Sequence, residues 1–285
     1  MYTVYMYNIG FYHIFITFIM CLQIVTALFF AFAGLSGPLA LIVGGAVYFA
    51  MPVLLFTRLS AQKLTAVLEL RRPGLKSAVY VLSLSVCIYP AALVLSAVTS
   101  VFFTNHLPEV VGTMATQANP LIMFAAFAIS PAVFEEVLLR GMLGKPLKHL
   151  GLRGALLNGL YFGLIHLNPH QFFYAFALGV LLYYMLILTG SIWAPILSHF
   201  TINSLALTLF FTELPILLSD PNMALGFFII PTVIFVFLLK KFIRDNSGKL
   251  AADEALPSAD NKILTPSFIV MLAVYFFIVF SFSLF

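Results

Sequence analysis

Apolar runs long enough to cross a lipid bilayer recur along almost the whole chain. About nine stretches, each near the ~20 residues that a spanning helix needs, are separated by breaks containing Gly, Pro, Asn or Asp. Because backbone polar groups must be satisfied within lipid, only helices and closed barrels span membranes. We therefore expect an all-α fold, a polytopic transmembrane helical bundle of about eight to nine spans. The spans lie at approximately 11–33, 38–57, 77–103, 120–144, 152–168, 171–189, 191–212, 224–243 and 263–285.

Charged residues are too few to cover a surface that faces water. They form 8% of the chain, whereas a soluble domain carries about 25%. This composition excludes soluble, disordered and disulfide-rich secreted proteins. We expect the lipid bilayer to surround the protein, and we expect no nucleic-acid partner. Lys and Arg gather in clusters typical of cytoplasmic loops. We expect a multi-pass integral protein of a bacterial plasma membrane, with cytoplasmic basic loops at 58–76, 145–151 and 244–262.

The placement of polar residues within the spans divides the chain into three segments. Residues 1–119 form N-terminal transmembrane helices, and residues 213–285 form C-terminal ones with the polar loop 244–262. Residues 120–212 form a core of four consecutive helices that carries almost every ionisable residue at membrane depth. Such residues are costly in lipid and usually serve function. We therefore look for a site in 120–212.

The span 120–144 contains two adjacent glutamates and an arginine. Adjacent helical residues point about 100° apart, so Glu135 and Glu136 cannot serve one partner. Glu136 and Arg140 are four apart, share a helix face and are expected to form an ion pair. Glu135 is then free to face the centre of the bundle. An ionised carboxylate in that position has the chemistry of a general base.

Two further polar stripes follow in the next spans. Asn158, Phe162 and His166 recur at intervals of four, and His199 and Asn203 do the same in 191–212. Glycines at 159 and 163 form a small-xxx-small pattern that lets another helix approach closely. The sequence therefore predicts that both stripes face one site. The remaining histidines are expected to be exposed and without a role, namely His13, His106, His149 and His170.

Other known hydrolytic arrangements are missing from the spans. The chain has no His-Glu-x-x-His zinc motif and no Asp within any predicted span. Ser36, in Gly34-Leu-Ser-Gly37, is expected to lie in a turn directly before Pro38. What remains is Glu-Glu-x-x-x-Arg, then Phe-x-x-x-His, then His-x-x-x-Asn.

In this order the motifs resemble those of the CAAX prenyl endopeptidase and bacteriocin-processing family, also called Abi-type intramembrane proteases. The run from Gly190 to His199 resembles the lead-in to the last motif of that family, and the resemblance covers about 120–212. The flanking spans match only as hydrophobic helices. The motif residues here are Glu135, Glu136, Arg140, Phe162, His166, His199 and Asn203.

The resemblance implies a membrane-bound peptidase that acts on a peptide or membrane-protein substrate, prenylated or of leader type. Glu135, with His166, would bind and deprotonate a water, and His199 and Asn203 would hold the oxyanion or the scissile carbonyl. A second layer of side chains would hold these residues in position, namely Glu136, Arg140 and Phe162. Whether one divalent, zinc-like metal ion also binds at Glu135, His166, His199 and Asn203 stays open.

Two other classes of function are compatible with the same transmembrane helices. A secondary transporter would also place polar residues at the midplane, but it would favour inverted repeats, which the sequence does not show. A non-catalytic membrane scaffold or immunity protein would not need the motifs.

One geometric condition must hold for the peptidase site. Glu135 lies about 22 Å along its span, whereas His166 ends its own, so the two meet only if that span is displaced or tilted, or if Pro131 kinks the first.

Overall fold

The structure is a computed structural model that describes residues 8–61, 63–212, 218–247 and 262–283. All regular structure in these ranges is helical, which confirms the predicted all-α class. The elements are α2 (Ile9–Phe32), α3 (Pro38–Gly45), η1 (Ala46–Ala50), α4 (Met51–Leu59), α5 (Leu64–Leu68), α6 (Leu75–Thr99), α7 (Leu107–Gln117), α8 (Pro120–Phe124), η2 (Ala125–Ile129), α9 (Ser130–Glu136), η3 (Val137–Met142), η4 (Lys145–Leu150), α10 (Leu152–Leu164), α11 (Pro169–Thr189), α12 (Trp193–Phe210), α14 (Pro221–Asn246) and α15 (Pro266–Ser283).

Six helices of the described chain are long and apolar enough to cross a membrane. They are Ile9–Phe32, Pro38–Leu59, Leu75–Thr99, Pro120–Met142, Pro169–Thr189 and Pro221–Asn246. A polytopic bundle is therefore confirmed, but three predicted spans are not among the six. α10 has only 13 residues, the described part of α15 counts among the shorter apolar helices, and α12 carries the polar residues His199 and Asn203. Most of the predicted loop 244–262 lies outside the described residues.

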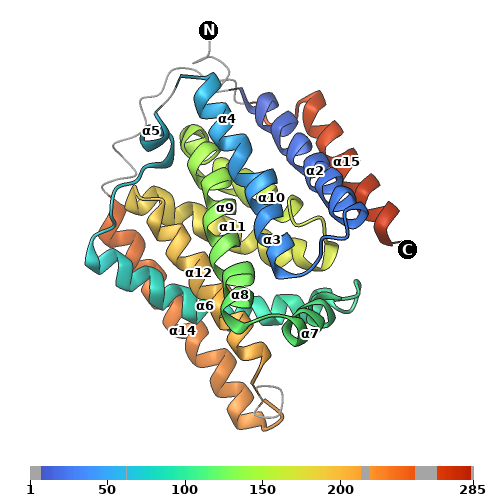
Figure 1. Ribbon diagram of the computed structural model, residues 1–285. Helices are drawn as coiled ribbons and strands as arrows, with labels where there is room; N and C mark the ends of the chain where they lie inside the picture. Colours follow the sequence, from blue (N-terminus) through green and yellow to red (C-terminus); the bar gives the residue numbers. More distant parts are fainter. Residues whose placement is uncertain (1–7, 62, 213–217, 248–261, 284–285) are drawn as a thin grey trace.

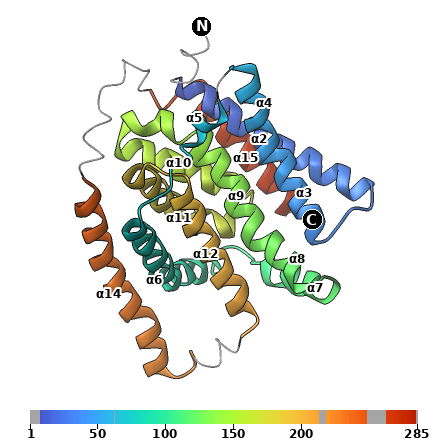
Figure 2. The ribbon, with the colours of Figure 1, turned by 60° about the vertical axis from the view of Figure 1, so that its left-hand side comes forward.

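The helices surround a central group made of α9, α11 and α12 (Figure 1). On one flank α2 packs along α15, although the two stand near opposite ends of the chain. On the other flank α6 packs against both α12 and α14, and α14 forms an outer edge (Figure 2). One large hydrophobic core joins these elements. The predicted core segment 120–212 thus supplies the centre of the bundle, and the flanking helices enclose it.

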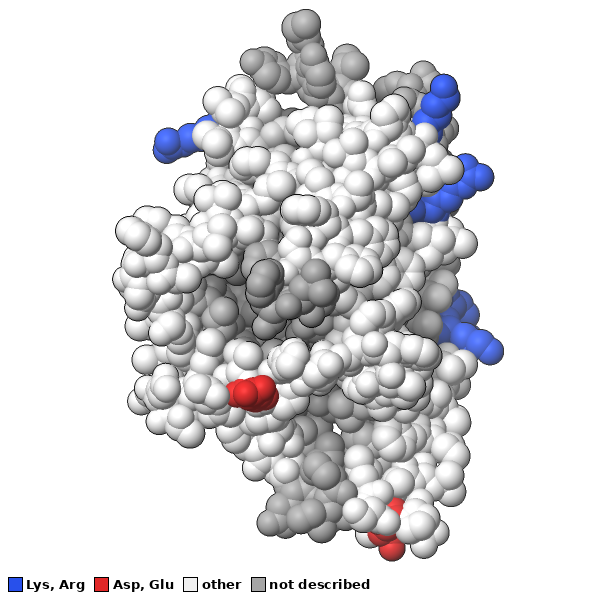
Figure 3. All heavy atoms as spheres, turned by 90° about the vertical axis from the view of Figure 1, so that its right-hand side faces the viewer, with Lys and Arg blue, Asp and Glu red and all other residues white. Residues whose placement is uncertain are grey.

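The outer surface is apolar over a broad zone. Large side chains such as Leu28, Val233 and Phe277 are exposed on the long outer helices. On the face in Figure 3 charged side chains are few, and the visible Lys and Arg lie above the visible Asp and Glu. Exposed apolar surface of this extent needs a partner, and for helices of spanning length that partner is lipid.

Glycines let α10 and α11 pack in close contact, as the small-xxx-small pattern predicts. A Cβ added to Gly159 would lie 2.8 Å from the carbonyl oxygen of Phe176 on α11. A Cβ added to Gly179 on α11 would lie 2.9 Å from the Cα of Gly159. Real Cβ atoms need more room than this, so only glycine allows the two backbones to come so close. The backbone of α11 therefore lies directly against that of α10.

We expect Gly159→Ala to destabilise the protein by about 1–3 kcal/mol, because the added methyl group must push α11 away. The measurement is a melting curve of the purified protein in detergent. Gly226→Ala on α14 is the matched control, since its Cβ would meet nothing nearer than the Cδ1 of Ile230 at 3.9 Å. That variant should melt at or slightly above the wild-type temperature. Equal melting of both variants would contradict the close packing.

Two π-helical segments, η2 and η3, flank α9 in the fourth span. Such turns are rare in helices and often occur at functional sites. In η3 the Leu143 N–H donates to the Leu138 oxygen at 3.1 Å, whereas in an α-helix it would donate to the Leu139 oxygen. The Nδ2 of the buried Asn158 donates to that Leu139 oxygen at 2.8 Å. The irregular helix is thereby tied to α10 inside the bundle.

Candidate active site

The predicted ion pair between Glu136 and Arg140 is confirmed. The Arg140 Nη1 donates to the Glu136 Oε1 at 2.8 Å, and both side chains are fully buried. The Arg140 Nη2 also donates to the Gly179 carbonyl oxygen at 2.9 Å, on the α11 backbone that the glycines bring close. Arg140 therefore joins the fourth span to α11. Its charge is balanced in a setting where an unpaired ion would be strongly unfavourable.

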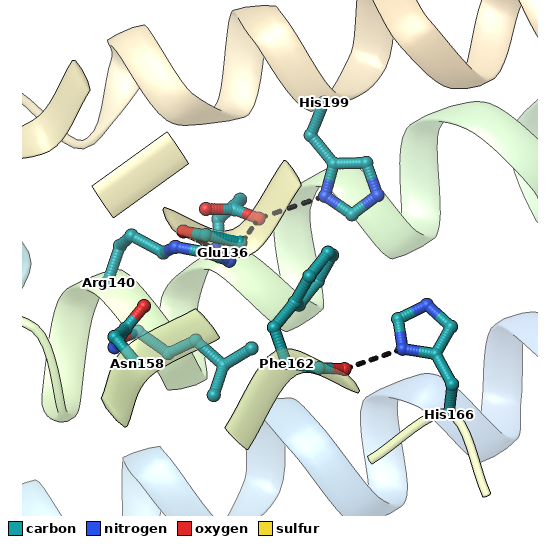
Figure 4. Close-up of polar contacts among 8 residues, drawn as sticks. Glu136, Arg140, Asn158, Phe162, His166 and His199 are labelled. Carbon is teal, nitrogen blue, oxygen red and sulfur yellow. Dashed lines mark hydrogen bonds and ion pairs between the residues drawn. The ribbon is translucent and has the colours of Figure 1, made fainter. Parts of the chain in front are cut away.

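Glu136 also binds His199, a contact that the sequence did not indicate. The same Oε1 atom lies 2.9 Å from the Nδ1 of His199 on α12 (Figure 4). A carboxylate oxygen only accepts, so Nδ1 must be the donor. In the neutral imidazole the lone pair is then on Nε2. A carboxylate behind a histidine fixes its orientation and raises its basicity, as in the outer shells of metal and acid–base sites.

His166 is held in the same tautomer by a different partner. Its Nδ1 lies 2.7 Å from the Phe162 carbonyl oxygen, which can only accept a hydrogen bond. The Nε2 of the neutral ring again carries the lone pair. Two histidines from separate helices thus have Nδ1 turned to the protein, and each leaves Nε2 for a substrate, a water or a metal ion.

Phe162 lies between the charged pair and the two histidines (Figure 4). Its ring centroid is 4.6 Å from the Arg140 Cζ, within range of a cation–π interaction. It meets the rings of His166 and His199 at nearly right angles, with centroids 4.9 and 5.5 Å away. The motif phenylalanine therefore spaces the two imidazoles and covers the guanidinium.

A cavity of about 340 Å³ brings the four predicted catalytic residues together. Glu135, His166, His199 and Asn203 all line it, although they come from α9, the end of α10 and α12. Glu135 points away from the Arg140 pair, as its place in the helix predicts, and it is only half-buried. Its Oε2 is nevertheless buried and has no hydrogen-bond partner in the described part of the chain.

The short α10 explains how His166 reaches the same cavity as Glu135. Thirteen helical residues extend about 20 Å, less than a bilayer core, so the helix ends within the bundle. His166 stands two residues beyond that end, after Ile165, and Leu167 then turns the chain with a left-handed φ of +50°. Asn168 caps α11 by accepting the His170 N–H at 2.9 Å. This turn brings His166 to the wall of the cavity that Glu135 also lines.

The prediction that His13 and His170 are exposed was wrong. Both are buried, with relative exposures of 0% and 1%. The His13 Nδ1 lies 3.0 Å from the Thr265 Oγ1, and the His170 Nε2 lies 2.9 Å from the Ser100 Oγ. Both partners are distant in sequence, so no local pattern indicates the burial. His170 also lines the 340 Å³ cavity, and so does Tyr174 on α11, which no sequence signal singled out.

The donor set suits a zinc-like ion in kind, with two imidazole nitrogens, a carboxylate and an amide. Within the described residues, however, no three His, Cys, Asp or Glu side chains lie close enough together to hold a metal ion. The side chains as placed therefore do not fit a metal site, and a metal would require them to draw together. The chemistry below rests on the side chains alone.

Comparison with protein families agrees with the motifs. Residues 117–205 match the family model described as type II CAAX prenyl endopeptidase Rce1-like. These residues form an Rce1-like domain. No curated protein and no solved structure matches the chain.

The Rce1-like domain coincides closely with the predicted core 120–212 and contains all seven motif residues. The match is consistent with the CAAX prenyl endopeptidase and bacteriocin-processing family, which confirms the resemblance. Together with six helices of spanning length, it identifies an integral membrane protein with a domain of a peptidase family.

Proposed function

We propose that this protein is an intramembrane endopeptidase that hydrolyses a peptide bond with a water activated by Glu135. The observation that supports this best is the shared cavity, whose wall includes Glu135, His166, His199 and Asn203. General acid–base hydrolysis of an amide needs a base for water, a stabiliser for the oxyanion and an acid for the leaving amine. These side chains can supply each of the three.

The proposed reaction starts when Glu135 takes a proton from water, while the Nε2 of His166 accepts the other hydrogen and orients the oxygen. The hydroxide adds to the carbonyl carbon. The Asn203 amide then donates to the resulting oxyanion, and so does the Nε2 of His199 when that ring has taken up a proton from solvent before the reaction. The Glu136 carboxylate, 2.9 Å from Nδ1, holds the imidazole in this orientation. Glu135 finally passes its proton to the leaving amine, and the peptide bond breaks.

The cavity wall indicates what kind of substrate binds. Glu135 is the single Asp, Glu, Lys or Arg among its lining residues in the described chain. Most of the rest are apolar, including Leu93, Leu178, Ile202 and Phe210. An apolar peptide segment delivered from the membrane suits such a wall better than a charged soluble one. We propose a prenylated peptide, a leader peptide or a membrane-protein segment as substrate.

The test is cleavage of defined peptides by the purified protein in liposomes. One internally quenched peptide carries a farnesylated cysteine three residues before its C-terminus, the second lacks the farnesyl group, and the third is a hydrophobic leader sequence. We expect cleavage of at least one, followed by fluorescence and confirmed by mass spectrometry. If the protein instead moves a solute across the liposome membrane and cleaves none, a secondary transporter would take the place of the peptidase.

Removal of divalent metal should leave cleavage nearly unchanged, because the described side chains are not gathered around a common metal position. The measurement is the cleavage rate after dialysis against a strong chelator, with the metal content of the same sample determined by mass spectrometry. A loss of activity that zinc restores, together with about one metal per chain, would establish the zinc-like ion at Glu135, His166, His199 and Asn203.

We propose that the three basic loops face the cytoplasm of a bacterial cell. Two ion pairs support their being on one side of the membrane. The Lys148 Nζ lies 3.1 Å from the Glu69 Oε1, which joins 145–151 to 58–76. The Lys76 Nζ lies 2.8 Å from the Asp245 Oδ2, which joins 58–76 to the start of 244–262. Basic loops gathered at one end follow the positive-inside rule.

A further inference from the structure

A second cavity, of about 300 Å³, lies on the other side of Glu135 and His166. It is enclosed by α2, α3, η1, η2 and α9, whereas the catalytic cavity lies towards α6, α7, α11 and α12. Both cavities are lined by the same five residues, Phe127, Pro131, Glu135, His166 and Gln171. The proposed general base therefore stands in the partition between two cavities.

Polar groups without partners gather around this second cavity. The Gln23 Nε2 and the Glu135 Oε2 are both buried and have no hydrogen-bond partner among the described residues, and both side chains line it. Tyr48 and Ser130 contribute hydroxyl groups to the same wall. Tyr48 is also close enough to Glu135 for their side chains to interact electrostatically. Buried polar groups almost always have partners, and in a cavity of this size the usual partner is ordered water.

The cavity between α6, α11 and α14 shows that not every cavity has this character. It measures about 530 Å³, and apolar side chains line it except for Tyr174 and Tyr184. No Asn, Gln, Ser or charged residue lines it within the described chain. Large cavities lined in this way stay dry. Polarity rather than size therefore distinguishes the cavity beside Gln23.

We propose that the cavity lined by Gln23, Tyr48 and Ser130 holds water and supplies the nucleophile to Glu135 from the side opposite the substrate. This rests on the proposed peptidase function. A substrate that fills the 340 Å³ cavity displaces the water there, yet each cleavage consumes one water molecule. At about 30 Å³ per molecule, a 300 Å³ cavity has room for several waters. Gln23 and Tyr48 are then positioning residues that keep this water next to the carboxylate.

Thiol labelling tests the hydration without depending on cleavage. In a background with Cys21→Ala and Cys87→Ala, single cysteines replace Gln23 or, as the control, Leu181 of the apolar cavity. Both parent residues are half-buried. The charged reagent MTS-ethyltrimethylammonium reacts with thiolate, which requires water, so Gln23→Cys should react at least about tenfold faster than Leu181→Cys in liposomes.

The neutral reagent methyl methanethiosulfonate shows whether each thiol can be reached. If it modifies Gln23→Cys while the charged reagent does not, the cavity is dry and the proposal is overturned. If neither reagent modifies Gln23→Cys or a second variant, Ser130→Cys, the cavity admits nothing from water and the proposal is likewise overturned. Labelling of Gln23→Cys in a protein that cleaves no peptide would refute the peptidase function and leave the hydrated cavity standing.

A kinetic measurement tests the supply of water to the reaction. Gln23→Leu fills most of the space of the side chain but removes its hydrogen-bonding amide, so kcat should fall about three- to tenfold with KM unchanged. Gln23→Asn retains the amide and should restore most of the loss. Because Gln23 is outside the catalytic cavity, a rise in KM would indicate a distorted substrate site instead. Wild-type kcat in a folded Gln23→Leu protein would overturn the proposal.

Discussion

Glu135→Gln should lower the cleavage rate by about 10²–10⁴-fold, the usual loss when one general base is removed. Glutamine keeps the shape and one acceptor oxygen but cannot take a proton from water. Folding should be nearly unchanged, because the Glu135 Oε2 has no hydrogen-bond partner among the described residues and an amide is easier to bury than a carboxylate. The measurement is kcat on any peptide that the wild type cleaves, alongside a melting curve in detergent.

Glu136→Gln is the matched control, one residue away. It weakens the bonds to both Arg140 and His199, so its melting temperature should fall, whereas that of Glu135→Gln should not. Some activity should remain because the base is intact, although His199 loses the carboxylate that orients it. If Glu135→Gln kept full function in every assay that the wild type supports, the protein would be a binding or scaffold protein and not a peptidase.

Features set by short, regular spacing could be predicted from the sequence. The Glu136–Arg140 ion pair follows from a separation of four residues on a helix. The close contact at Gly159 follows from the same periodicity. The all-α membrane class follows from apolar runs and few charges. In each case the information lies within one turn or one span, so no knowledge of tertiary packing is required.

Features set by contacts between distant helices could not be predicted. The Glu136–His199 contact joins residues 63 apart, and nothing in either motif identifies the other as its partner. The burial of His13 and His170 depends in the same way on hydroxyl groups just before α15 and just after α6. Hydropathy also gave 152–168 the length of a span, because it could not show that α10 stops after 13 residues. That early end places His166 inside the bundle, so the length of α10 decides where His166 joins the site.

Arg140→Ala should destabilise the protein by about 3–5 kcal/mol, the cost of leaving one partner of a buried ion pair behind. Three contacts disappear together: the bond to the Glu136 Oε1, the bond to the Gly179 oxygen, and the stacking on Phe162. Yield, melting temperature and cleavage should therefore fall in parallel. Arg153→Ala is the control for loss of an arginine, since its side chain is exposed and should change stability by no more than about 0.5 kcal/mol.

A double-mutant cycle separates the role of the ion pair from that of the packing. Arg140→Met fills most of the space but leaves Glu136 charged and buried. Adding Glu136→Gln removes that charge, so the double variant should melt above Arg140→Met alone, with an interaction energy of about 0.5–3 kcal/mol. The double variant should still cleave slowly, because His199 no longer has a carboxylate behind it. If Arg140→Met lost its activity with an unchanged melting temperature, Arg140 would contact the substrate directly rather than hold Glu136 in place.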